Sequence, residues 1–181
     1  YAPSCMRSVF LTLLFCGLGS DLEPGLTLRI WDLGRPVDFL AEIGPGQTPN
    51  VDRLVTQVDF SGSASFGAPS DYFYAELSGT LQLDEPGDYA FSLSSDDGSR
   101  LWINDVIVVD HDGVHPAQPK IGSIRLNPGG VDIRIEMFEN TGEESLRLEW
   151  KVPGSQEFVL VPSDVLFTEE GVTRVVSPGP K

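Results

Sequence analysis

The sequence predicts an all-β protein, an antiparallel β-sandwich with a few short helical turns. Short apolar runs with period-two alternation recur along most of the chain, and clusters of turn-forming residues separate them. No long stretch keeps the 3.6-residue period of an amphipathic helix. Of the 181 residues, 40% are hydrophobic and 22% are charged, which is ordinary for a folded domain and wrong for a disordered chain.

The first expected strands each follow from their own pattern. Residues 26–31 alternate, so that Leu and Ile side chains share one face. Residues 72–83 form a long strand, and Gly79 within it predicts a bulge. A turn at residues 85–88 leads into a further alternating strand at residues 89–93.

The later expected strands include a tight hairpin. Residues 101–103 and 106–109 are apolar and flank the turn-forming pair Asn104-Asp105, the usual sequence of a two-residue hairpin loop. The remaining strands are expected at residues 121–126, 131–138, 145–151 and 158–161.

The segments between these strands are expected to take other forms. Residues 51–58 and 162–166 have the spacing of one or two helical turns. Residues 35–50 contain three prolines and predict a long ordered loop. We expect residues 20–168 to form one domain and the Pro- and Gly-rich residues 169–181 to be a linker to a further domain of the same polypeptide.

The first 19 residues are expected to lie outside the folded domain. A short basic start at Met6-Arg7 precedes an apolar run at residues 9–18, which is too short to span a bilayer. Small residues follow, as in a secretory signal peptide, although a buried core strand or helix is the alternative. Cleavage near Gly19 would remove Cys5 and Cys16 and leave a secreted, periplasmic or cell-surface protein without disulfides.

The strongly negative net charge of the chain limits the classes of partner that it can bind. There are 27 Asp and Glu against 12 Lys and Arg, a formal charge of −15. Nucleic acids and anionic membrane surfaces require clustered positive charge, so both are disfavoured as partners. Cations, or neutral ligands held through a cation, suit this charge better.

Two adjacent carboxylates, Asp96 and Asp97, form the most informative motif. They lie between two expected strands, and in an extended trans backbone neighbouring side chains point to opposite faces. A cis peptide between them would bring both carboxylates to one side, where hard oxygen ligands without cysteine favour Ca²⁺. The alternative is a polar hairpin turn, because Asp and Gly are common turn residues.

Two further polar clusters and the tryptophans are weaker candidates. Residues 110–115 contain both histidines but match neither an EF-hand loop nor a complete zinc site, so a turn is favoured there. The acidic loop at residues 139–144 either faces the Asp pair across one end of the sandwich or is simply solvated. Trp31 and Trp102 have the chemistry to stack on sugars, whereas Trp150 continues an apolar face and is expected in the core.

The sequence lacks the common catalytic signatures. There is no Gly-x-Ser-x-Gly, His-Glu-x-x-His, Walker or Gly-x-Gly-x-x-Gly motif. A carboxylate pair for glycoside hydrolysis stays open, because sequence alone does not give the spacing of acids in space. We therefore expect a non-catalytic binding module.

Several stretches together resemble the PA14 domain family, named after the N-terminal domain of anthrax protective antigen. The resemblance implies a jelly-roll-related β-sandwich and, as in fungal adhesins of the family, an aspartate pair that binds Ca²⁺, which in turn binds sugar hydroxyls. Asp96 and Asp97 match that pair, and Glu139 or Asn140 falls at the position of the asparagine that the second loop contributes. The matching stretches are residues 25–32, 71–79, 87–91, 94–103, 109–113, 133–139 and 146–150.

The resemblance therefore implies a calcium-dependent carbohydrate-binding module whose partners are glycans or glycoconjugates. The expected metal ligands are Asp96, Asp97, Glu139 and Asn140, and the expected ligand-binding residues are Asp96, Asp97, Asp110, His111 and Trp102. The alternative is a structural module that positions a downstream domain, since similar modules begin large bacterial envelope proteins with sugar-oxidising or glycan-degrading enzyme domains.

Overall fold

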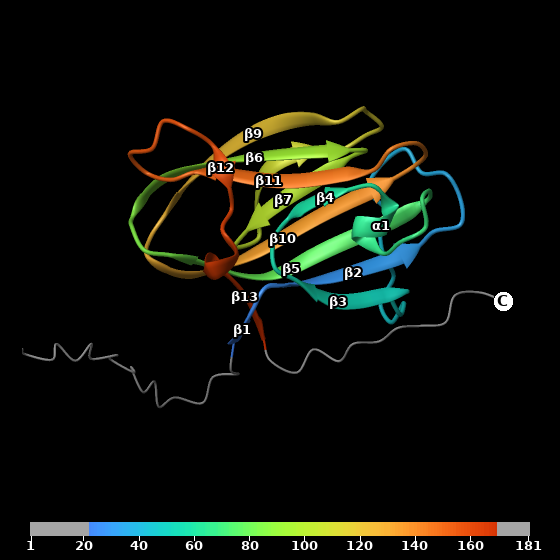
Figure 1. Ribbon diagram of the computed structural model, residues 1–181, viewed down its shortest axis with the longest axis horizontal. Coiled ribbons are helices and arrows are strands. Elements are labelled where there is room, and N and C mark those ends of the chain that lie inside the picture. Colours follow the sequence, from blue (N-terminus) through green and yellow to red (C-terminus); the bar gives the residue numbers. More distant parts are fainter. Residues whose placement is uncertain (1–21, 170–181) are drawn as a thin grey trace, which may run out of the picture.

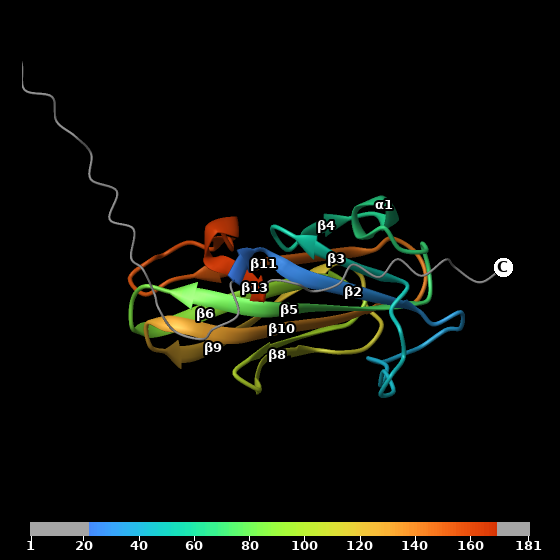
Figure 2. The ribbon, with the colours of Figure 1, turned by 90° about the horizontal axis from the view of Figure 1, so that it is seen from below.

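The protein is a sandwich of two antiparallel sheets packed face to face (Figures 1 and 2). The computed structural model describes residues 22–169. This architecture confirms the predicted fold class. The expected signal peptide and nearly all of the expected linker lie outside the described residues.

The larger sheet, sheet A, is centred on two 11-residue strands that pair along their whole length. In spatial order it contains β1 (Leu22–Pro24), β13 (Leu166–Glu169), β5 (Phe73–Leu83), β10 (Gly129–Glu139), β7 (Ser99–Ile103) and β8 (Val106–His111), while β2 (Leu26–Asp32) also pairs with β5 and is followed by β3 (Val51–Val55).

The smaller sheet, sheet B, lies across sheet A and closes the sandwich. It contains β12 (Val159–Leu160), β11 (Ser145–Lys151), β6 (Gly87–Asp96) and β9 (Gln118–Leu126), with β4 (Asp59–Ser61) pairing with one end of β11. Two short helical elements complete the fold, α1 (Ser63–Phe66) and the 3-10 turn η1 (Ser163–Val165).

The core forms where the alternating side chains of the two sheets meet. Leu28 and Ile30 of β2 are fully buried, as the alternation of residues 26–31 predicts. Leu146 and Leu148 of β11 are also fully buried, and Trp150 on the same face is 7% exposed. The period-two pattern therefore identifies the core face of both sheets correctly.

The predicted hairpin at Asn104-Asp105 is confirmed. It joins β7 to β8, and the two residues have φ angles of 47° and 61°. Positive φ at both central positions is the requirement of a type I′ turn, which Asn and Asp tolerate better than most residues.

Two expectations about local structure are wrong. Residues 51–58 contain β3 and the start of the connection to β4 instead of helical turns, because Val51 and Leu54 lie in a strand that pairs with β2. Gly79 is not a bulge, since it stays in register opposite Ile133 of β10. It marks the point where the other edge of β5 changes its partner from β2 to β13.

The contact between the two sheet edges gives a prediction about Gly122→Ala. Gly122 lies in β9, and an added Cβ would come 1.8 Å from the carbonyl oxygen of Val108 in β8. Because backbone must move to relieve this overlap, we expect a loss of about 1–3 kcal/mol or more in urea unfolding. The control Gly44→Ala meets only the flexible Gln47 side chain and should change stability by less than about 0.5 kcal/mol.

Candidate metal centre

The adjacent aspartates lie where the chain crosses from one sheet to the other. β6 of sheet B ends at Asp96 and β7 of sheet A begins at Ser99, so Asp97 and Gly98 form the crossing. The Asp96–Asp97 peptide bond is cis. The alternative of a polar hairpin turn is wrong, because the two strands belong to different sheets.

Gly98 allows three segments to approach one another at this crossing. A Cβ on Gly98 would lie 2.5 Å from a ring carbon of Phe138 and 2.8 Å from both the backbone nitrogen and oxygen of Gly113. The absence of a side chain at this position therefore brings the end of β10 and the loop after β8 against the Asp pair.

Backbone amides from two neighbouring loops hold the aspartates. The carboxylate of Asp97 is buried and accepts hydrogen bonds from the N–H of His115 (3.0 Å) and the N–H of Asn140 (2.9 Å). Asp96 accepts one from the N–H of Ala117 at 3.1 Å. These bonds fix Asp97 with respect to the end of β10 and Asp96 with respect to the segment before β9.

Glu139, the last residue of β10, completes an acidic cluster with the two aspartates. One carboxylate oxygen from each of Asp96, Asp97 and Glu139 lies within 4.8 Å of the other two. Glu139 is fully buried, and among the described residues neither of its oxygens has a hydrogen-bond partner. The amide oxygen of Asn140 is also buried without a partner among those residues.

The cluster is electrostatically unfavourable without a cation. Burial, followed by the charges of Asp97 and Asp96, raises the pKa of Glu139 to about 8. Burial and the charge of Asp97 raise the pKa of Asp96 as well. None of the ion pairs within residues 22–169 involves these three carboxylates.

The donor set fits calcium. Ca²⁺ binds oxygen at about 2.3–2.6 Å, so ligand oxygens on opposite sides of one ion lie up to roughly 5 Å apart. The 4.8 Å limit within the cluster meets this spacing. Three carboxylates without nitrogen or sulfur donors also match a hard cation.

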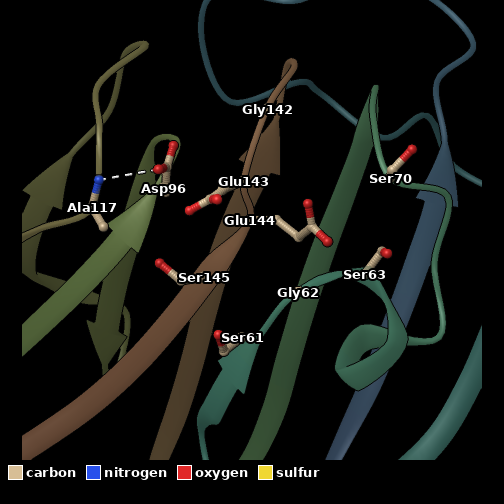
Figure 3. Close-up of a pocket in the computed structure, with 10 residues that line it drawn as sticks. All are labelled: Ser61, Gly62, Ser63, Ser70, Asp96, Ala117, Gly142, Glu143, Glu144 and Ser145. Atoms are coloured by element: carbon tan, nitrogen blue, oxygen red, sulfur yellow. Dashed lines mark hydrogen bonds between the residues drawn. The ribbon is translucent and has the colours of Figure 1, made fainter.

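An open pocket of about 560 Å³ lies beside the cluster and shares Asp96 with it (Figure 3). Its walls come from the loop after β4, the loop before β5, the loop before β11 and the segment before β9. The lining residues are Ser61, Gly62, Ser63, Ser70, Asp96, Ala117, Gly142, Glu143, Glu144 and Ser145.

The second predicted cluster supports the loop that holds Asp97. The rings of His111 and His115 stack with centroids 3.8 Å apart, and a ring nitrogen of His115 lies 3.0 Å from the carbonyl oxygen of His111. Burial lowers the pKa of His111 to about 4. Asp110 pairs with Arg100 at 3.2 Å. Neither His111 nor Asp110 lines the pocket beside the cluster.

The tryptophans lie away from this pocket. Trp31 and Trp150 are 9% and 7% exposed. Trp102 donates its indole N–H to Glu136, and the guanidinium of Arg134 lies 4.5 Å from its ring centroid. It lines a separate hollow of about 270 Å³ together with Arg134.

The sequence-based reasoning missed most of the pocket wall. Ser61, Ser63 and Ser70 lie in the short segment around α1, for which the sequence indicates no candidate residue. Glu144 lies in the predicted acidic loop. Its burial is what distinguishes it from a solvated glutamate, and the sequence does not show that burial.

A family model described as PA14 domain matches residues 22–164. Two curated relatives match parts of the chain. Anti-sigma-I factor RsgI3 of Acetivibrio thermocellus is 26% identical over 123 residues, which are 66% of this chain and 19% of that protein. Probable beta-glucosidase J of Neosartorya fischeri is 30% identical over 125 residues, 67% of this chain and 14% of that protein. The chain therefore spans less than a fifth of either relative.

Solved structures share the fold. A PA14 sugar-binding domain from an RTX adhesin superposes with a TM-score of 0.62 at 18% identity, covering 82% of this chain and 99% of that one. The Epithelial Adhesin 9 A domain of Candida glabrata, solved with Galb1-3GlcNAc, has a TM-score of 0.61 at 12% identity and covers 82% and 90% of the two chains. Within residues 22–169, no helix has the length and hydropathy to cross a membrane.

Proposed function

The chain belongs to the PA14 domain family, and from this premise we propose that its acidic cluster binds Ca²⁺ and, through it, a carbohydrate in the neighbouring pocket. The observation that carries the proposal is the fully buried Glu139 beside Asp96 and Asp97, because neither of its oxygens has a hydrogen-bond partner within residues 22–169. Buried carboxylates are normally paired or bound to metal, and a divalent cation would pair all three at once.

The pocket gives the proposal its ligand class. A bound Ca²⁺ keeps coordination positions for ligands from outside the protein, and neighbouring hydroxyl groups of a sugar are oxygen donors of the right kind. Asp96 belongs to both the cluster and the pocket, so a sugar on the ion would also contact the pocket wall. Two structural neighbours, the PA14 sugar-binding domain of an RTX adhesin and the Epithelial Adhesin 9 A domain with Galb1-3GlcNAc, agree with this ligand class.

The first test is thermal unfolding in Ca²⁺ and in chelator. Calcium at about a hundred times its Kd stabilises a folded protein by about 2.7 kcal/mol. At roughly 2–4 °C per kcal/mol for a domain of this size, we expect the Tm to rise by about 5–11 °C. Glycan-array binding should be present in Ca²⁺ and lost in chelator.

No change in Tm at millimolar Ca²⁺ would contradict the metal site. A Tm rise without any glycan signal would support the ion but not the carbohydrate. Magnesium serves as the control cation, because it binds oxygen at about 2.0–2.1 Å and requires a near-ideal octahedral geometry, whereas Ca²⁺ accepts more ligands in a flexible arrangement.

A second candidate function is a non-catalytic module that positions another domain. One observation favours it. β1 and β13 pair, with Leu22 opposite Glu169, so the first and last described residues lie side by side. Such a module attaches to a larger protein through one side, and both curated relatives are much longer proteins. Glycan binding by the protein alone would favour the first function, and its absence together with a stable contact to another domain would favour the second.

A further inference from the structure

The pocket beside the cluster carries more negative charge than a calcium site requires. Glu144 is only 5% exposed, and its carboxylate points into the pocket (Figure 3). None of the pocket residues drawn there donates a hydrogen bond to it. Glu143 lies on the same wall, between Glu144 and Asp96.

No positive side chain offsets these acids within the pocket. The ten lining residues include neither Lys nor Arg, and the other side-chain functions among them are the hydroxyls of Ser61, Ser63, Ser70 and Ser145. With Ca²⁺ bound, two positive charges against the three cluster carboxylates leave −1, and Glu143 and Glu144 bring the total to −3. If Glu139 keeps its proton the total is −2, so the pocket stays negative in either state.

A carboxylate that faces the pocket and accepts no hydrogen bond from the residues lining it is available to a donor from the ligand. A ligand that covers this carboxylate removes it from water, which costs several kcal/mol unless a cation or several donors satisfy it. Hydrogen bonds between a charged amine and a carboxylate are about twice as strong as neutral ones. A ligand ammonium would therefore form a charge-assisted hydrogen bond with Glu144, for which no residue lining the pocket competes.

We propose that this pocket selects amino sugars with a free protonated amine, and that Glu144 binds that amine. The inference rests on the proposed carbohydrate function and specifies its ligand class. An N-acetylated sugar presents a neutral amide to the same carboxylate. A uronic acid brings a further negative charge toward Glu143 and Glu144 and is repelled.

The test is an NMR titration of the protein in millimolar Ca²⁺ with glucosamine, N-acetylglucosamine and glucuronic acid at about pH 6.5, where the amine is protonated. We expect glucosamine to bind about tenfold more tightly than N-acetylglucosamine, and glucuronic acid to bind most weakly. Glu144→Gln should remove the preference for glucosamine, while a calcium-dependent rise in Tm should remain.

A matched control separates the pocket from the overall charge. Glu157→Gln makes the same change in net charge at an exposed residue that does not line the pocket, so the preference should remain. Equal binding of the three sugars, or an unchanged preference in Glu144→Gln, would overturn the inference about amino sugars. If the wild type still showed a higher Tm in Ca²⁺, the proposed calcium site would stand. If the wild type showed no rise in Tm with Ca²⁺, the proposed function itself would be overturned.

Discussion

Asp97→Asn is expected to abolish the calcium-dependent rise in Tm and, with it, glycan binding. Asp97 contributes a buried charge to the cluster, and its two oxygens accept the N–H groups of His115 and Asn140. The amide of Asn accepts only one of these bonds, so the ion-free variant should lose about 1–3 kcal/mol of stability. Thermal unfolding with Ca²⁺ and with chelator measures both effects in one series.

A second aspartate outside the cluster gives a matched control for this variant. One oxygen of Asp112 accepts the N–H groups of Leu40 and Gly113, and the other lies 3.4 Å from the guanidinium of Arg100. The amide oxygen of Asn can keep both N–H bonds, so Asp112→Asn removes an aspartate charge and the contact with Arg100. We expect it to lower stability by less than Asp97→Asn and to keep the rise in Tm with Ca²⁺. Equal calcium responses in the Asp97→Asn variant and the wild type would contradict the metal site.

The sequence predicts the core of this fold well because the relevant signals are local. Alternation in residues 26–31 and 145–151 reports directly which side chains face the other sheet, and both faces are buried as expected. The Asn104-Asp105 turn depends on two residues that accept positive φ, and it forms as predicted. Where the pairing partner decides the structure, as in β3, helical spacing in the sequence misleads.

The site is only partly predictable because its defining property is burial. The pair Asp96-Asp97 and the position of Glu139 are visible in the sequence through the family resemblance. The burial of Glu139 and Glu144 is not, because it arises from strands whose paired residues are far apart in the sequence, such as Phe73 of β5 and Glu139 of β10. From sequence alone, a charged residue in a loop is expected to be exposed to solvent, and only the fold shows whether other segments cover it.

Glu139→Gln is expected to change stability in opposite directions with and without calcium. In the ion-free protein Glu139 is buried beside two carboxylates, and its pKa of about 8 lies above the ordinary value of 4.5. Between these values the folded state holds a proton that the unfolded state has released, so stability falls as pH rises through this window. Gln carries no such titration, and the ion-free variant should be the more stable protein above about pH 8.

Calcium reverses the comparison because the ion requires the carboxylate that Gln removes. In Ca²⁺ the bound ion holds Glu139 ionised, so the wild type should lose little of its stability between about pH 6 and pH 8.5, and its stabilisation by Ca²⁺ over chelator should grow with pH, whereas Glu139→Gln should gain little from Ca²⁺. Tm values of both proteins at about pH 6 and pH 8.5, each in Ca²⁺ and in chelator, test the crossing. Burial also raises the pKa of Asp96, so the ion-free variant should keep a smaller fall of stability with rising pH. An ion-free pH dependence that is identical in wild type and variant would show that Glu139 is not the titrating group, and Glu157→Gln provides the reference for an exposed glutamate.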